Sequence, residues 1–197
     1  MHWISSEFAA SSTLAAQRLE EGAILGWFQG RSEIGPRALG NRSILADPRD
    51  PKLKDRINRD IKHREEWRPY APVILAGAHS TLLDLPEPHP QVSELMLLSA
   101  TMYPEPIRRG VRSHRPMYPA ITHRDGSTRP QIVTEKSNPR LWDLMGRFAT
   151  LTSCPVLLNT SFNDNGEPIV ETPEDAIKSF QSLKLDALVL GDYFIER

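Results

Sequence analysis

The chain has 197 residues, of which 39% are apolar and 25% are charged, and its formal net charge is −1. This length suits one large domain, and the composition is that of an ordinary soluble protein with a core. A nearly neutral chain gives no general argument for binding nucleic acid or a membrane surface. No apolar run approaches the roughly 20 residues of a membrane span, and the first residues lack a signal-peptide pattern. We therefore expect a cytoplasmic protein.

The chain contains a single cysteine, Cys154, which excludes an internal disulfide and a metal cluster built on cysteines. No histidine lies near Cys154 in the sequence, and Pro155 follows it directly. A small buried residue is therefore a better interpretation of Cys154 than a nucleophile. We assign no metal ligands to the chain.

The first third of the chain predicts helices that alternate with strands. Apolar residues at helical spacing predict a helix over residues 12–21, and the apolar run 23–28 predicts a buried strand. Residues 29–45 contain three glycines and one proline, which predict a shaped loop rather than a regular element. Residues 51–62 carry one apolar stripe and predict a helix, which a proline-held connection links to a strand over residues 73–75.

The middle of the chain is less regular. Residues 85–90 are rich in proline and predict a loop, and residues 104–116 predict a long excursion with many Arg and Pro residues. Residues 92–102 fit either a helix or a strand, and their pattern does not decide between the two.

Two short apolar runs predict a hairpin after this excursion. Residues 117–122 and 130–133 are its expected strands, and the turn between them contains Asp-Gly, a pair that favours hairpin turns. His123 and Arg129 would then lie on the hairpin, close to its turn.

The last third of the chain returns to alternating elements. Residues 137–150 predict a helix opened by Asn and Pro, and residues 154–158 predict a buried strand that ends in a loop. Thr172, followed by Pro and Asp, predicts the start of a helix over residues 173–183, and residues 187–190 predict the last strand. Helices and strands that alternate around a hairpin indicate an α/β (α+β) fold with a mixed sheet in a single domain.

The glycine-rich loop carries three arginines, Arg31, Arg37 and Arg42, with Glu33 as its only acid. Glycines let a backbone approach a ligand closely, and arginines form paired hydrogen bonds to phosphate oxygens. The alternative is a surface loop with solvated arginines, in which Glu33 holds Arg31 or Arg37 in place. The loop follows neither the Walker nor the dinucleotide pattern, so no standard phosphate motif applies.

A second polar loop follows the strand predicted at 154–158. It is dense in small hydrogen-bonding side chains, namely Asn159, Thr160, Ser161, Asn163 and Asn165. Hydroxyls and amides between a strand end and a helix start commonly hold a polar ligand. The alternative is that these side chains satisfy their own turn. Two aromatic residues near the polar segments, Trp67 and Phe162, are expected in the core.

Residues 31–68 contain eleven Lys and Arg residues against seven Asp and Glu, a local excess of four positive charges. Most charges on the helix over 51–62 are expected to form a solvated face. A competing hypothesis is that this basic helix binds RNA, or that the chain is a non-catalytic nucleotide-binding subunit.

Four blocks of the sequence, taken in order, resemble the C-terminal domain of NodU-type O-carbamoyltransferases, which carbamoylate antibiotics and nodulation factors. These blocks are residues 30–44, 64–72, 122–131 and 158–169. The resemblance implies the YrdC-like fold, a mixed twisted sheet with flanking helices, which threonylcarbamoyl-adenylate synthases and the hydrogenase-maturation carbamoyltransferase share. Residues 1–197 would form one such domain, with residues 1–12 a linker or an extension. Residues 93–111 depart from the family pattern.

The resemblance also implies roles for individual residues. In this family a Lys-x-Arg pair and a Ser-x-Asn pair bind the nucleotide, and Lys62-His63-Arg64 and Ser161-Phe162-Asn163 are similar to these pairs. Arg68 is an alternative to Arg64 in the first pair. The residues implied in catalysis are Arg37, Lys62, Arg64 and Arg68. The residues implied in substrate or nucleotide binding are Arg31, Arg42, Ser43, His123, Arg129, Asn159, Ser161 and Asn163. A structural hydrogen bond is an alternative role for His123.

The reaction implied by the resemblance begins with carbamoyl phosphate and ATP, with Mg²⁺ on the triphosphate, and forms carbamoyl-adenylate. The carbamoyl group would then pass to a hydroxyl of a small-molecule acceptor, as in secondary-metabolite biosynthesis. Family members carry a large N-terminal ASKHA-type domain with a metal site and the acceptor pocket, so the resemblance implies a partner domain or subunit. A third hypothesis is an enzyme that passes the carbamoyl group to its acceptor without that domain. The residues present do not identify the acceptor.

Overall fold

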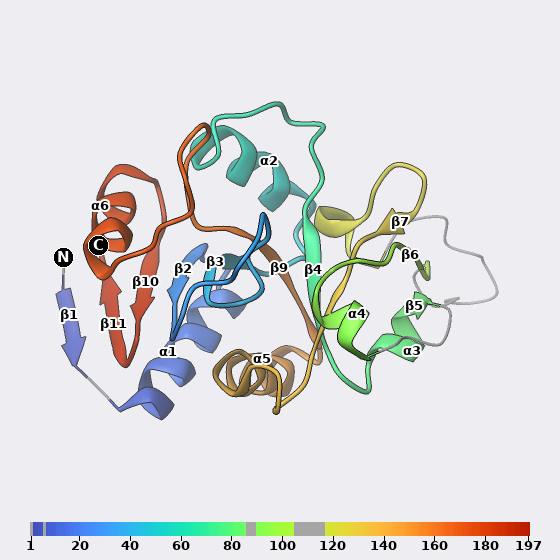
Figure 1. The fold of residues 1–197 in the computed structure, drawn as a ribbon, viewed down its shortest axis with the longest axis horizontal. Coiled ribbons are helices and arrows are strands. Elements are labelled where there is room, and N and C mark those ends of the chain that lie inside the picture. The colour runs from blue at the N-terminus through green and yellow to red at the C-terminus, as the bar shows by residue number, and fades with distance from the viewer. Residues whose placement is uncertain (1, 6, 86–89, 105–116) are drawn as a thin grey trace.

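The computed structural model describes residues 2–5, 7–85, 90–104 and 117–197. Its centre is an eight-stranded sheet, and a smaller three-stranded sheet lies beside it (Figure 1). Across the large sheet the strands are β1 (His2–Ser5), β11 (Tyr193–Glu196), β10 (Ala187–Leu190), β2 (Leu25–Phe28), β3 (Arg42–Ala46), β9 (Val156–Ser161), β4 (Ala71–Leu75) and β8 (Gln131–Val133). The small sheet contains β5 (Leu83–Asp84), β6 (Ala100–Met102) and β7 (Ser127–Thr128).

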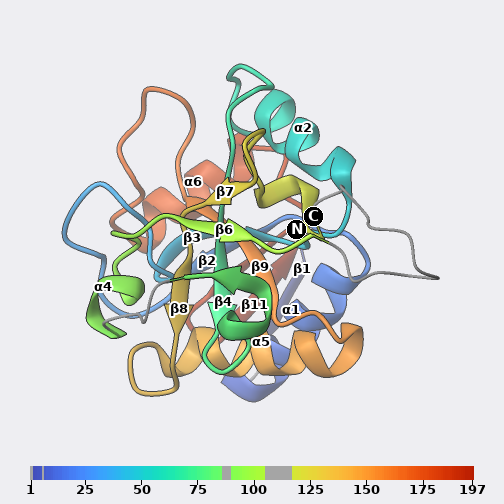
Figure 2. The ribbon, with the colours of Figure 1, turned by 90° about the vertical axis from the view of Figure 1, so that its right-hand side faces the viewer.

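The helices cover both faces of the large sheet. They are α1 (Phe8–Glu20), α2 (Pro51–Asp60), α3 (His79–Leu82), α4 (Pro90–Glu94), the 3₁₀ helix η1 (Pro119–Ile121), α5 (Pro139–Thr152) and α6 (Pro173–Ser182). Helices α1 and α5 lie together under one face, and α2 and α6 lie on the opposite side (Figures 1 and 2). Within the described residues, no helix combines the length and the apolar composition that a membrane crossing requires.

The large sheet is mixed, as the sequence predicts. Strand β10 runs parallel to β2, and β4 runs parallel to β8, whereas the other neighbouring strands are antiparallel. Strand β9 lies between β3 and β4, so its polar carboxyl end reaches the segments that precede both of these strands. This placement determines where the functional side chains meet.

Local signals start the helices where the sequence predicts. The Asn138 side chain accepts a hydrogen bond from the Leu141 N–H at the start of α5. Thr172 and Asp175 form a reciprocal capping box at the start of α6. Helix α2 likewise begins at a proline, with Asp50 accepting from a backbone N–H. These three starts are confirmed because each depends on contacts within one turn of helix.

The strand boundaries correct several predictions. Residues 42–45, expected to belong to a loop, lie in β3 (Arg42–Ala46), because the backbone of this segment pairs with both β2 and β9. Strand β9 continues to Ser161 rather than ending at residue 158. The terminal strands β1 and β11 were not expected, and they pair with each other at one edge of the sheet. Residues 92–102 include both the end of α4 and β6.

The predicted hairpin is wrong. Residues 119–121 form the 3₁₀ helix η1, and β8 pairs in parallel with β4 rather than with residues 117–122. The turn at residues 123–127 does exist, since the Gly126 N–H donates to the His123 carbonyl and the His123 N–H donates to the Ser127 carbonyl. It leads into β7, which pairs with β6. The local turn was therefore predictable, whereas its strand partners were not.

The core confirms some single-residue expectations and corrects one. Phe162 and Cys154 are buried as expected. Trp67, which was expected in the core, is 63% exposed. The predicted loop at 85–90 and the predicted excursion at 104–116 lie largely outside the described residues.

Candidate functional site

A cavity of about 150 Å³ lies where the carboxyl end of β9 meets the start of β4 and the loop before β3. Its described lining residues are Pro36, Arg37, Ala38, Arg64, Pro69, Tyr70, Ala71, Met96, Arg129, Asn159, Thr160 and Ser161. Three of them are arginines from segments far apart in the sequence, and none of them is acidic. Such a lining favours a small anion.

The arginine loop before β3 is fixed by its own backbone. One carboxylate oxygen of Glu33 accepts from the N–H groups of Leu39 and Asn41, at 2.6 and 2.7 Å. Glu33 thus shapes the loop through its backbone, whereas the surface-loop alternative has Glu33 holding Arg31 or Arg37 in place. The Trp27 indole N–H donates to the Gly40 carbonyl, which fastens the end of the loop to the sheet. These contacts hold Arg37 at the cavity.

Gln131 and Asn159 fix the same loop from the opposite side. The Gln131 amide nitrogen donates to the Leu39 carbonyl at 2.7 Å. The Asn159 amide nitrogen donates to the Ala38 carbonyl at 3.1 Å and to Gln131 Oε1 at 3.0 Å. Both amides are buried, so this network is worth more than solvated hydrogen bonds would be. It ties the loop to β8 and β9.

Two buried residues orient the guanidinium group of Arg64. Its Nε donates to Asn58 Oδ1 at 2.8 Å, and its guanidinium lies 4.5 Å from the centre of the Tyr70 ring. The Tyr70 hydroxyl donates to the same Asn58 oxygen at 2.5 Å. Asn58 also donates to the carbonyls of Glu66 and Arg68, which holds the connection between α2 and β4. The remaining Arg64 nitrogens are oriented by this packing.

Arg129 is the third arginine that lines the cavity. Its Nε is buried and has no hydrogen-bond partner among the described residues. Burial lowers the pKa of Arg129, and the nearby Arg37 guanidinium lowers it further. Two like charges at one cavity repel each other, and an anion between them would relieve that repulsion.

Lys62 lies behind the cavity with its ammonium group against a turn that follows β9. Its Nζ lies 2.6 Å from the Ser161 carbonyl, 2.8 Å from the Asn163 carbonyl and 2.7 Å from Asn163 Oδ1. Burial lowers the Lys62 pKa to about 7, and Arg64 adds to this effect, whereas Asp164 opposes it. The surrounding oxygens favour the charged form, whereas burial opposes it. With a pKa of about 7, Lys62 is present in both its charged and its neutral form at neutral pH.

Ser161 and Asn163 are partly committed to this turn. The Ser161 hydroxyl donates to Asn163 Oδ1 at 2.7 Å, and the Asn163 amide nitrogen donates to the Glu167 carbonyl. Ser161 lines the cavity, whereas Asn163 does not. Asn163 therefore shapes the turn that presents Ser161, and this agrees with the local-turn alternative for that side chain.

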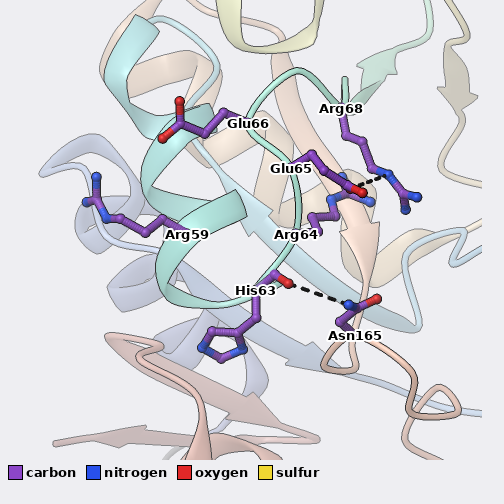
Figure 3. Close-up of a pocket in the computed structure, with 7 residues that line it drawn as sticks. All are labelled: Arg59, His63, Arg64, Glu65, Glu66, Arg68 and Asn165. Carbon is purple, nitrogen blue, oxygen red and sulfur yellow. Dashed lines mark hydrogen bonds and ion pairs between the residues drawn. The ribbon is translucent and has the colours of Figure 1, made fainter.

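An open hollow of about 450 Å³ adjoins the cavity and shares Arg64 with it. Figure 3 shows its lining, which is Arg59, His63, Arg64, Glu65, Glu66, Arg68 and Asn165. Arg68 pairs with Glu65 at 3.0 Å, and Arg59 points away from Arg64 and Arg68. His63 Nδ1 lies 2.8 Å from Asp164, which links the end of α2 to the turn after β9. Arg68 thus lies beside the cavity rather than in it.

Three predicted site residues lie away from the cavity. Arg42 is 3% exposed, stacks 3.5 Å from the centre of the Phe28 ring and donates to the carbonyls of Gln29 and Gly30. Burial lowers the pKa of Arg42. The Ser43 hydroxyl is buried and accepts from the Gly40 N–H. Arg31 is exposed, outside the described lining.

His123 lies at a different hollow. It lines a space of about 760 Å³ with Lys54, Trp67 and other residues, and its Nδ1 lies 3.1 Å from the Ser127 hydroxyl. The hydrogen bond agrees with the structural alternative for His123. The structure therefore brings together Arg37, Arg64, Arg129, Asn159 and Ser161, with Lys62 directly behind them.

The sequence analysis missed residues that support this site. Asn58 and Tyr70 orient Arg64, and Gln131 fixes Asn159. Asn58 follows Ile57 at the edge of the apolar stripe of α2, and Gln131 is the first residue of the short strand β8. Both side chains are polar and buried. Thr160 and Met96 also line the cavity. Thr160 belongs to the polar loop that the sequence indicates, whereas Met96 carries no pattern that would have singled it out.

Fewer of the positive charges over residues 52–62 are free to bind RNA than the sequence suggests. Arg56 Nη2 donates to both carboxylate oxygens of Asp186, at 2.8 and 2.9 Å, and Arg59 pairs with Asp60. Lys62, at the end of this segment, is buried. Three of the five basic residues over 52–62 are thus committed within the fold, which weakens the hypothesis that this helix binds RNA.

The fold defines the class of protein. The chain aligns with full-length HypF, solved in a phosphate- and nucleotide-bound form, at a TM-score of 0.63 and 16% identity, covering 93% of this chain and 25% of that one. It aligns equally well with a Sua5 variant from P. abyssi, at a TM-score of 0.63 and 14% identity, covering 93% and 49%. The chain therefore has a YrdC/Sua5-like fold.

The sequence places the chain in a particular family. Residues 16–197 match the family described as carbamoyltransferase C-terminus, and the chain belongs to it. Nodulation protein NolO of Bradyrhizobium diazoefficiens is 45% identical over 192 residues, which cover 98% of this chain and 33% of that protein. The 3'-hydroxymethylcephem-O-carbamoyltransferase of Streptomyces clavuligerus is 39% identical, with 96% and 32% covered. The chain thus spans about a third of the length of these relatives.

Proposed function

We propose that this chain is the part of an O-carbamoyltransferase that binds carbamoyl phosphate and ATP and forms carbamoyl-adenylate. The observation that carries the proposal is the meeting of Arg37, Arg64 and Arg129 at one cavity whose described lining contains no acid. The relative named as a cephem O-carbamoyltransferase supports the chemistry, and the HypF structure described as phosphate- and nucleotide-bound supports the class of ligand.

The reaction needs charge neutralisation and alignment more than a protein nucleophile. Water cleaves carbamoyl phosphate to carbamate and phosphate. A carbamate oxygen then attacks the α-phosphorus of ATP, and pyrophosphate leaves as the carbamoyl-adenylate bond forms. The arginines remain charged throughout, so they stabilise the negative charge at each step.

The size of the cavity indicates which part of the ligands it holds. A volume of about 150 Å³ corresponds to roughly five water molecules, which suits a phosphate with a small acyl group but not a whole nucleotide. The larger open hollow shares Arg64 with the cavity and would take the rest of the nucleotide. Arg68, on the wall of this hollow, would then face the nucleotide rather than the carbamoyl group.

Mg²⁺ would enter on the triphosphate. The described residues contain no group of three His, Cys, Asp or Glu side chains placed to hold a metal ion. The nucleotide's own oxygens are suitable ligands, because Mg²⁺ commonly binds through substrate phosphates. We therefore assign no side chain of this chain to the metal.

Isothermal titration with carbamoyl phosphate and with MgATP tests the proposal. We expect the folded chain to bind both ligands. Arg64→Met and Arg129→Met should each weaken carbamoyl phosphate binding by roughly 10- to 150-fold, the worth of hydrogen bonds to a charged group. Arg147→Met, which changes an arginine of α5 that pairs with Asp143, is the matched control and should leave binding unchanged. Folded wild-type protein that binds neither ligand would contradict the proposal.

A further inference from the structure

The side-chain amide of Asn159 has only one possible orientation. Its nitrogen lies 3.1 Å from the Ala38 carbonyl, which can only accept a hydrogen bond. Its second partner, Gln131 Oε1, is fixed in turn because the Gln131 amide nitrogen donates to the Leu39 carbonyl. The backbone carbonyls of Ala38 and Leu39 therefore determine which atom of each side-chain amide is the nitrogen. The remaining polar atom of the Asn159 side chain is the oxygen.

This oxygen lacks a hydrogen-bond donor. Asn159 Oδ1 is buried and has no partner among the described residues, although its residue lines the cavity. An unpaired buried acceptor costs free energy, so a donor supplied by a ligand would be favourable. The remainder of the described polar lining consists mainly of donors, the guanidinium groups of Arg37, Arg64 and Arg129.

The two kinds of group select different parts of a ligand. The arginines attract oxygen anions, whereas a carbonyl-type oxygen repels them and accepts only from an N–H or O–H group. The unprotonated phosphate oxygens of an acyl phosphate dianion cannot donate to Asn159 Oδ1, and neither can the methyl of an acetyl group. The NH₂ of a carbamoyl group can.

We propose that Asn159 is a specificity-determining residue that recognises the NH₂ of the carbamoyl group through its Oδ1. This inference rests on the proposed function, because it assigns the carbamoyl end of the ligand to the same cavity. Gln131 is a positioning residue in this arrangement, since it touches Asn159 and lines neither the cavity nor the adjoining hollow. The arginines hold the phosphate, and Asn159 distinguishes the acyl group.

The test compares ligands that differ in one group. Acetyl phosphate has a methyl where carbamoyl phosphate has its NH₂, and inorganic phosphate has neither. We expect the wild-type chain to bind carbamoyl phosphate roughly 5- to 150-fold more tightly than acetyl phosphate, the range expected for an acceptor left unpaired. Equal affinity for the two acyl phosphates would overturn the proposal without any variant.

The variant Asn159→Leu keeps a similar volume and removes the oxygen. We expect its preference for carbamoyl over acetyl phosphate to approach one, while its affinity for inorganic phosphate stays within about threefold of the wild type. Circular dichroism and thermal melting establish that the variant is folded. A folded Asn159→Leu protein that retains the wild-type preference would overturn the assignment.

A second variant covers the case in which Asn159→Leu does not fold. Gln131→Leu leaves Asn159 in place and removes one of the two acceptors that orient it. We expect a reduced but measurable preference for carbamoyl phosphate, and an unchanged preference would count against the proposal. A folded wild-type chain that binds neither carbamoyl phosphate nor MgATP would instead contradict the proposed function, so the two failures are distinguishable.

Discussion

Lys62 carries its ammonium group into a cluster of oxygen atoms that all belong to one turn of the chain, at Ser161 and Asn163. It is 4% exposed, and burial opposes its charge while these oxygens favour it. A lysine in this balance responds to any new charge nearby. A bound anion would favour the protonated form and raise the Lys62 pKa above its value of about 7.

This balance predicts proton uptake on anion binding. Above pH 7 the empty site holds a partly deprotonated Lys62, so binding takes up a proton and affinity falls as pH rises from 7 to 9. Titration with sulfate, which does not itself titrate in this range, at pH 8 in two buffers of different ionisation enthalpy should give uptake of up to one proton. Lys62→Met should abolish the uptake. Heats that do not depend on the buffer in the wild type would show that Lys62 is not coupled to the site.

Arginines of the same loop segment have different roles because of their neighbours. Arg42 is surrounded by carbonyls and the Phe28 ring, and it stabilises the entry into β3. Arg37, five residues earlier, lines the cavity. Both arginines satisfy the same sequence argument for phosphate binding. Only the distribution of buried acceptors around each guanidinium distinguishes a structural arginine from one that is available to a ligand.

At the scale of elements, the loop before β3 connects the sheet to α5 through hydrogen bonds and close packing at Gly40. Gly40 has a φ of +99°, and a Cβ at this position would overlap the Leu141 side chain of α5. The same residue gives its carbonyl to Trp27 and to Asn138. Gly40 therefore combines a left-handed backbone with a close contact, and both features require glycine.

Gly40→Ala should consequently be more destabilising than a glycine replacement with the same backbone but open space. Gly22 has a φ of +86° with no atom near its missing Cβ, and it is the matched control. We expect Gly22→Ala to cost about 1 kcal/mol and Gly40→Ala roughly 2–4 kcal/mol, because overpacking adds to backbone strain. Urea unfolding of both variants measures the difference. Equal midpoints would mean that the loop can move away from α5 without cost.

At the scale of the whole molecule, the chain spans about a third of the length of the relatives it matches. Its open hollow and its small basic cavity lie side by side on one region of the surface. In the proposed reaction the carbamoyl group is activated here and received by an acceptor that the remaining two thirds of a full-length relative would bind.

This division predicts two separable activities. With MgATP and carbamoyl phosphate, the chain alone should release pyrophosphate and form carbamoyl-adenylate, and mass spectrometry and phosphorus NMR detect these products. A carbamoylated alcohol should appear only when the remaining segment of a full-length relative is supplied as a separate chain. Formation of that product by this chain alone would favour the hypothesis of a self-sufficient enzyme.

The sequence by itself determined the features that depend on neighbouring residues. The starts of α2, α5 and α6 follow from caps within one turn, and the buried strands β2, β4 and β10 follow from short apolar runs. The four sequence blocks also determined the family, because their order is a property of the chain alone. The polar loops were recognisable as places for a ligand.

Only the tertiary structure decided which of those polar residues meet. Strand β9 lies between β3 and β4, and β8 lies beside β4 in parallel, and no local pattern encodes pairings between segments so far apart. These pairings bring Arg129 and Asn159 to Arg37, and they leave Arg42 and His123 elsewhere. The sequence gives the chemistry of each side chain. Whether that side chain can bind a ligand depends on whether distant backbone groups already occupy its hydrogen-bonding atoms.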